Sequence, residues 1–107
     1  MAESKQSIDI AKNLKIIDWL KTELIEGVAN FHKAILKNSE ELILDALAGI
    51  VVVCYLLARR LGVQFTRLDK KVRQKVDYHI ENKHEVELWY GDLSSLQEYL
   101  KDREQAK

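Results

Sequence analysis

Two pairs of carboxylates have a spacing that suits chemistry. Glu23 and Glu26 lie three residues apart, and Glu41 and Asp45 lie four apart, so each pair shares one face if its segment is helical. Four carboxylates from two antiparallel helices can bind magnesium, which takes oxygen ligands at about 2.0–2.1 Å in an octahedral shell. The same residues are also compatible with a simpler interpretation, in which they are solvated surface acids.

A second group of candidates is basic. Seven lysine and arginine residues fall between Arg59 and Lys75, against one acid, Asp69. Such a local surplus attracts phosphate groups or an acidic partner, although it is also typical of the wet face of an amphipathic helix. The candidate phosphate-binding residues in this run are Lys70, Lys71 and Arg73.

The remaining reactive side chains form no recognisable motif. His32, His79 and His84 are not spaced three or four residues apart, so no two of them form a helical metal-ligand pair. Cys54 is the single cysteine, which excludes an internal disulfide and a cysteine metal site. The sequence contains no Gly-rich phosphate loop and no nucleophile motif.

Composition narrows the classes of function. The 107 residues are 47% hydrophobic and 32% charged, the balance of a globular protein. We therefore expect one domain over residues 1–107 with polar tails at 1–7 and 103–107. Seventeen basic residues balance seventeen acidic ones, which removes the positive field of a dedicated nucleic-acid binder. The unpaired cysteine and the lack of an apolar secretory signal in residues 1–7 predict a cytoplasmic protein.

Apolar residues recur at helical spacing along the chain, and the sequence contains no proline, so we predict an all-α fold. Its main feature is a long antiparallel hairpin with a short turn at residues 38–39, where Ser39 caps the second helix. Two shorter C-terminal helices complete the bundle, the last of them after a short helical turn. The first predicted helix runs from about residue 7 to 37 and the second from about 40 to 60. The third begins at a cap on Thr66 and ends near Asn82, and the last begins at a cap on Asp92.

An apolar stripe on the first helix is predicted to face the second. Its members recur at steps of three and four, and they are Ile17, Leu20, Leu24, Gly27 or Val28, Phe31 and Ile35.

The segment from Leu42 to Ala58 is the most apolar part of the chain. No charged residue occurs between Ala46 and Ala58, and a helix that is apolar all round must be covered all round. The uncharged run is shorter than the roughly 18–20 residues that cross a bilayer. We therefore expect a buried core helix and no membrane contact. Because a chain this small buries a modest core, we also expect a homo-oligomer, with contacts through exposed apolar surface on this helix and near Trp89.

Residues 34–62, with the sequence AILKNSEELILDALAGIVVVCYLLARRLG, resemble the MazG family of nucleotide pyrophosphohydrolases. The apolar pattern and the AI and LARRLG landmarks carry this resemblance, and residues 14–100 are similar to the short, divergent MazG-like proteins. The resemblance implies an all-α, oligomeric protein. In the main family, magnesium held by an ExxE motif and an ExxD motif on successive helices supports hydrolysis of nucleoside triphosphates to monophosphate and pyrophosphate.

The four metal-binding positions of that pattern fall here on Gly27, Asn30, Ala46 and Gly49, and none of these is a carboxylate. A turn near residue 38 places Gly27 opposite Gly49 and Asn30 opposite Ala46. The available acids lie one turn toward the N-terminus of each helix. Because the helices are antiparallel, that shift separates the two acid pairs by roughly 12 Å along the axis. Since three of the four residues are small, we expect the helices to approach closely and to close the cleft.

The favoured function is a non-catalytic member of the nucleotide pyrophosphohydrolase superfamily that acts as a nucleotide-binding or protein-interaction module without a cofactor. One alternative is an active, magnesium-dependent pyrophosphohydrolase with a shifted site at Glu23, Glu26 and Asp45. The other is a purely structural, oligomerising helical protein.

Overall fold

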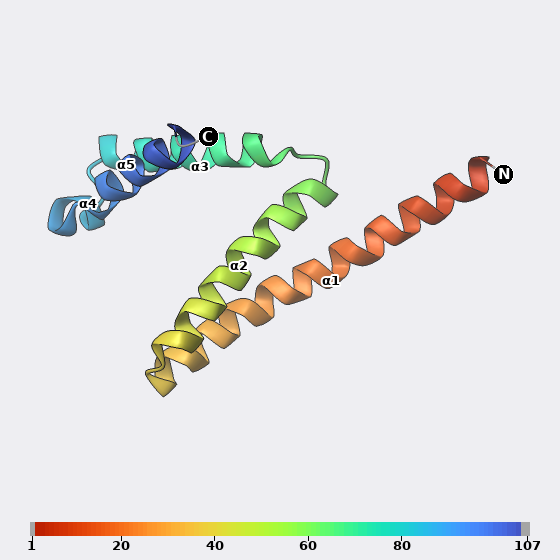
Figure 1. The fold of residues 1–107 in the computed structure, drawn as a ribbon, viewed down its shortest axis with the longest axis horizontal. Coiled ribbons are helices and arrows are strands. Elements are labelled where there is room, and N and C mark those ends of the chain that lie inside the picture. Colours follow the sequence, from red (N-terminus) through yellow and green to blue (C-terminus); the bar gives the residue numbers. More distant parts are fainter. Residues whose placement is uncertain (1, 106–107) are drawn as a thin grey trace. The chain divides into compact units, whose positions relative to one another are not determined.

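A computed structural model of the chain describes residues 2–105, with side chains from residue 6 onward, and every regular element in that range is a helix (Figure 1). The chain forms two compact units, Met1–Phe65 and Thr66–Lys107. The predicted all-α fold, with its long hairpin and shorter C-terminal helices, is confirmed. The helices are α1 (Ala2–Lys37), α2 (Glu40–Arg60), α3 (Phe65–Glu81), α4 (Glu85–Tyr90) and α5 (Asp92–Gln105).

The hairpin turn follows the predicted chemistry. Asn38 adopts a left-handed conformation with φ of 52°, which asparagine tolerates better than most residues. Ser39 then caps α2, because its hydroxyl oxygen accepts a hydrogen bond from the Leu42 amide at 3.3 Å. At the other end of α2, Gly62 has a φ of 86°, as expected for a glycine that ends a helix.

Some helix ends differ from the predicted ones. The predicted polar N-terminal tail is helical from Ala2, in keeping with the good helix formers in this segment. The predicted cap at Thr66 is wrong, since α3 already begins at Phe65. Asp92 is also not a cap but the first residue of α5, because the Gly91 carbonyl accepts the Ser95 amide at 3.1 Å.

α1 and α2 pack against each other through a narrow stripe of residues. Leu20 and Ala34 of α1 are 1% and 3% exposed, whereas Ile35 is 51% exposed. The predicted stripe is therefore right at Leu20 but ends on Ala34 and not on Ile35. A small residue at this position allows the two helix backbones to approach closely near the turn.

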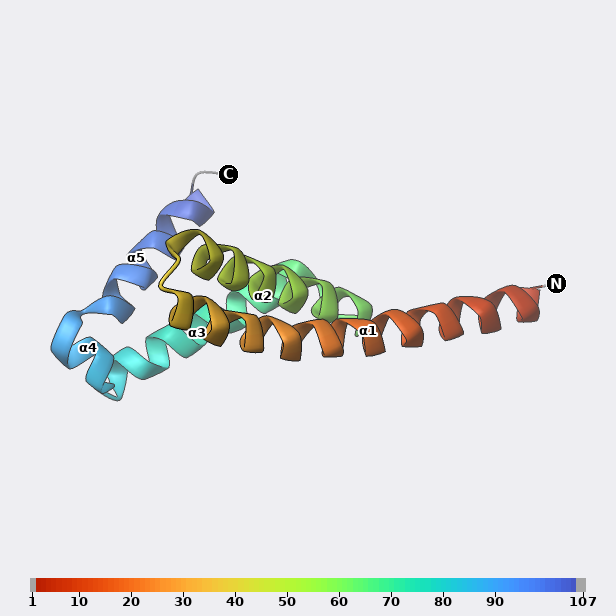
Figure 2. The ribbon, with the colours of Figure 1, turned by 90° about the horizontal axis from the view of Figure 1, so that it is seen from below.

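A pair of hydrogen bonds joins α1 and α2 at the end of the hairpin away from the turn. The Asn13 amide donates to the Arg60 carbonyl at 3.1 Å, and the Arg60 guanidinium donates to the Asn13 side-chain oxygen at 3.3 Å. α1 continues past this point, so its N-terminal part extends beyond the end of α2 (Figures 1 and 2).

α1 alone does not bury α2, in keeping with the expectation that one partner helix cannot cover it. α1 covers one face of α2 and buries Ala46, but the other faces expose large apolar side chains, including Leu44, which is 66% exposed. α2 is 21 residues long, and an 18-residue window within it has a mean hydropathy of 2.2, so by length and composition it could span a membrane. Core helices of soluble proteins also meet this criterion, but they are mostly buried, whereas this window is not. The exposed apolar residues of α2 are Leu42, Leu44, Leu47, Val51, Val52 and Leu56.

The second unit has a small core of its own between α3 and α5. Val76 and Leu100 are buried, and the Gln97 amide donates to the Asp77 carboxylate at 2.7 Å. Near α4 the apolar surface stays open, since Trp89 is 69% exposed. The predicted apolar surface near Trp89 is thus present in the chain.

Candidate functional site

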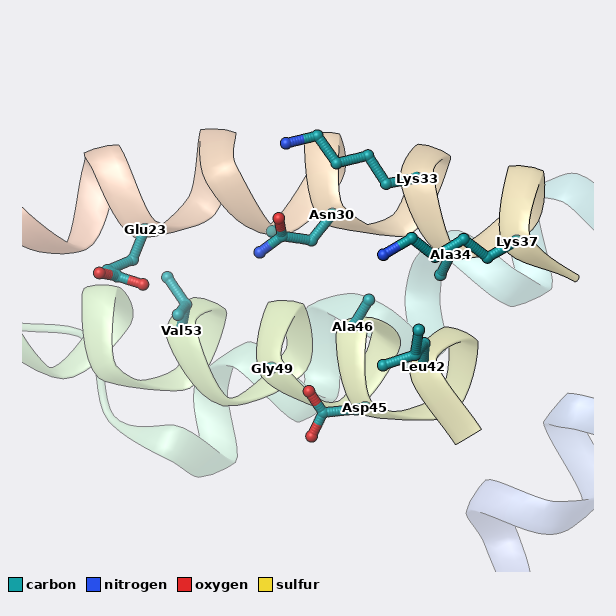
Figure 3. Close-up of a pocket in the computed structure, with 11 residues that line it drawn as sticks. Glu23, Asn30, Lys33, Ala34, Lys37, Leu42, Asp45, Ala46, Gly49 and Val53 are labelled. Carbon is teal, nitrogen blue, oxygen red and sulfur yellow. The ribbon is translucent and has the colours of Figure 1, made fainter. Parts of the chain in front are cut away.

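A cavity of about 350 Å³ lies between α1 and α2 (Figure 3). Gly27, Asn30, Ala46 and Gly49, the positions of the metal ligands in the MazG pattern that the sequence resembles, all line this cavity. The predicted register, in which Gly27 lies opposite Gly49, is therefore confirmed. Figure 3 shows the same register, with Glu23 beside Val53 and Ala34 close to Leu42. The lining residues are Glu23, Gly27, Asn30, Lys33, Ala34 and Lys37 from α1, and Leu42, Asp45, Ala46, Gly49 and Val53 from α2.

The two glycines of the cleft differ in how closely they approach the neighbouring helix. A Cβ atom built on Gly27 lies 3.0 Å from Cγ1 of Ile50, so no larger residue is accommodated there without movement. A Cβ built on Gly49 meets nothing within 4 Å. The expectation that the small residues close the cleft is therefore wrong, because the missing side chain at Gly49 leaves space that nothing else fills.

This difference predicts opposite effects of substitution at the two glycines. Gly49→Ala is expected to stabilise the protein by about 1 kcal/mol, since it gains helix propensity without a clash. Gly27→Leu is expected to destabilise it by about 1–3 kcal/mol through overpacking against Ile50. Urea unfolding followed by circular dichroism measures both, and effects of the same sign would contradict the packing described here.

The acids of the cleft do not converge on one point. Glu23 and Asp45 both line the cavity, but their carboxylates lie apart, with Val53 and Gly49 between them along the cleft (Figure 3). Glu26 and Glu41 are exposed and are not among the lining residues. Among the described side chains, residues 6–105, no group of three or more His, Cys, Asp or Glu residues could hold a metal ion. This donor set does not fit the octahedral oxygen shell of magnesium.

Lys33, Lys37 and Asn30 add positive charge and hydrogen-bond donors to the cleft. In Figure 3 the Lys37 side chain runs back along α1 and places its amine between the two helices, whereas Lys33 points away from α2. Asn30 extends from α1 toward α2. The two lysines were not among the site residues predicted from the sequence, although their spacing from Asn30 places them near the same helical stripe.

The basic candidates on α3 are not brought together into one site. Arg73 forms an ion pair with Glu104 at 3.8 Å, while Lys71 lines a different cavity, together with Lys75 and Tyr78. Lys70 is exposed. Lys70 and Arg73 are three residues apart and share a face of α3, whereas Lys71 leaves the helix about 100° away from Lys70.

His79 and His84, which are five residues apart and would not share a helix face, are neighbours in space. The rings of His79 and His84 are 5.4 Å apart between centroids, because the chain turns at Lys83, whose φ is 54°. His84 caps α4, since its Nδ1 atom accepts the Val86 amide at 3.1 Å. This histidine therefore has a structural role.

Comparison with known proteins identifies one relationship. A protein-family model described as the MazG-like family matches residues 10–93 of the 107-residue chain. The matched range includes both helices that form the cleft. No curated protein and no solved structure matches the chain.

Proposed function

Since the chain belongs to the MazG-like family, we propose that it is a non-catalytic member of the nucleotide pyrophosphohydrolase superfamily. It acts as a nucleotide-binding or protein-interaction module through the cleft between α1 and α2. One observation carries this proposal: the cleft is retained, but Gly27, Asn30, Ala46 and Gly49 line it where the family pattern has carboxylates. Without convergent oxygen ligands, magnesium cannot be positioned against a triphosphate.

An active enzyme with a shifted site is the second candidate. It is supported by the fact that Glu23 and Asp45 line the same cavity. To complete a magnesium shell, the exposed Glu26 would have to turn into the cleft, and the two helices would have to slide or close. This candidate therefore predicts that activity depends on all three acids.

A turnover assay separates the two candidates. Purified protein is incubated with magnesium and a panel of nucleoside triphosphates, and the release of pyrophosphate is measured. We expect no turnover above that of the Glu23→Gln/Asp45→Asn double variant, whose folding is checked by circular dichroism. Sustained release of pyrophosphate by the wild type, lost on Glu26→Gln or Asp45→Asn, would overturn the non-catalytic proposal.

We also propose that the protein is a homo-oligomer in which the exposed apolar face of α2 is covered by another copy. Leu44, Leu47 and Val51 are 66%, 45% and 54% exposed and recur at steps of three and four. Complete burial of such a side chain is worth roughly 1.5–3 kcal/mol, and because these three are already partly covered, about half of that remains to be gained for each. A purely structural role, with assembly but no ligand, would give no thermal shift with nucleotides.

The cytoplasmic location and the absence of membrane and nucleic-acid contacts stay predictions from composition.

A further inference from the structure

We propose that the cleft between α1 and α2 binds a phosphorylated small molecule directly, without a divalent metal ion, and that Lys37 and Asn30 hold its phosphate. This inference rests on the proposed non-catalytic function and names the class of ligand. It follows from a change in charge, because the carboxylates of the family pattern are absent at Gly27, Asn30, Ala46 and Gly49 while cationic and amide groups line the cleft.

The electrostatics of the cleft favour an anion near the hairpin turn. A site with four carboxylates repels phosphate unless a cation lies between them. Here two carboxylates line the cavity together with two lysines, of which Lys37 faces the space between the helices and Lys33 points away from α2 (Figure 3). Figure 3 places the Lys37 amine between the helices near Ala34, and the Asp45 carboxylate lies apart from it on α2. A phosphate beside Lys37 therefore needs no bridging metal.

The two proposed phosphate ligands are available for binding. Among the side chains of residues 6–105, which the structure describes, no hydrogen bond or ion pair engages the Lys37 amine or the Asn30 side chain. Lysine supplies a point charge and asparagine supplies an N–H donor, and hydrogen bonds from charged donors to phosphate are among the stronger ones in proteins. Neither side chain must leave a partner to bind the ligand.

The remainder of the cleft specifies the rest of the ligand. A volume of about 350 Å³ lies in the range of pockets that bind small molecules. Apolar side chains of Ala46 and Val53 line the cavity, on either side of the open space at Gly49 (Figure 3). At the far end, Glu23 accepts hydrogen bonds only, so it favours a ligand that carries N–H or O–H donors away from its phosphate. A nucleoside monophosphate has these properties.

Calorimetric titration in the presence of EDTA tests this proposal, with inorganic pyrophosphate and a set of nucleoside monophosphates as probes and the unphosphorylated nucleosides as references. We expect the phosphorylated probes to bind in EDTA and the nucleosides to bind at least about tenfold more weakly. Lys37→Met is expected to weaken binding about tenfold, and Lys37→Arg to restore most of it. Lys12→Met, on the exposed surface of α1 outside the cleft, is the matched control.

The binding assay and the turnover assay test the metal-free site and the non-catalytic proposal separately. No binding in EDTA, binding only with magnesium, or equal binding by Lys37→Met and Lys12→Met would overturn the metal-free site. Asn30→Ala provides a second variant, and its failure to weaken binding would also count against the site. Nucleotide turnover in the separate pyrophosphate assay would overturn the non-catalytic proposal, even if binding in EDTA were observed.

Discussion

Replacing Leu47 and Val51 of α2 with glutamate is expected to convert the assembled protein into monomers. Both side chains lie on the exposed apolar face of α2, at 45% and 54% exposure in the single chain. Each substitution removes the burial of an apolar side chain and places an unpaired carboxylate in the contact. In a symmetric dimer both copies carry the changes, so the dissociation constant is expected to rise at least about a thousandfold.

Size-exclusion chromatography with light scattering over a range of protein concentrations measures this effect. Leu36→Glu is the control, because Leu36 is the most exposed large apolar side chain of the chain's described residues, at 86%, and lies on α1. The control is expected to keep the mass of the wild type. A monomeric wild type, or a double variant with an unchanged mass, would contradict assembly through α2.

Leu20→Ala is expected to lower the free energy of unfolding by about 2–5 kcal/mol. Leu20 is 1% exposed and is the only large side chain that is fully buried among those described, so its truncation leaves a cavity where α1 meets α2. Ile25→Ala on the same helix is the control, since Ile25 is 72% exposed and should change stability by less than about 0.5 kcal/mol.

Urea unfolding at one fixed protein concentration gives both values, because oligomerisation makes apparent stability depend on concentration. Similar losses for Leu20→Ala and Ile25→Ala would show that the α1–α2 contact does not hold the hairpin together.

The features that could be predicted from the sequence are those set by local chemistry. Ser39 marks the start of α2 because its hydroxyl accepts the hydrogen bond of a free amide at the helix N-terminus. The chain must reverse just before Ser39, so residue 38 forms the turn. The length of that turn fixes the register, which is why Gly27 could be placed opposite Gly49 from the sequence, although the cleft between them was expected to be closed.

The features that could not be predicted depend on how far apart the helices lie and on what covers them. Hydropathy shows that the apolar side chains of α2 must be buried, but not whether other helices of the same chain or another molecule buries them. The cavity persists because Gly27 meets Ile50 while Gly49 meets nothing, a difference that two identical residues cannot reveal. Likewise, the sequence does not show that Arg73 pairs with Glu104, thirty-one positions away.

We have proposed that this MazG-like protein keeps a cleft between its first two helices without the metal site of its family. Manganese, which prefers the same oxygen ligands as magnesium, broadens the NMR signals of nearby amides. The four glycines of the chain provide the reporters, because Gly27 and Gly49 line the cleft and Gly62 and Gly91 do not. We predict that manganese broadens all four glycine amide signals to a similar, small extent. Saturable broadening of Gly27 and Gly49 alone, abolished by Glu23→Gln or Asp45→Asn, would contradict this account.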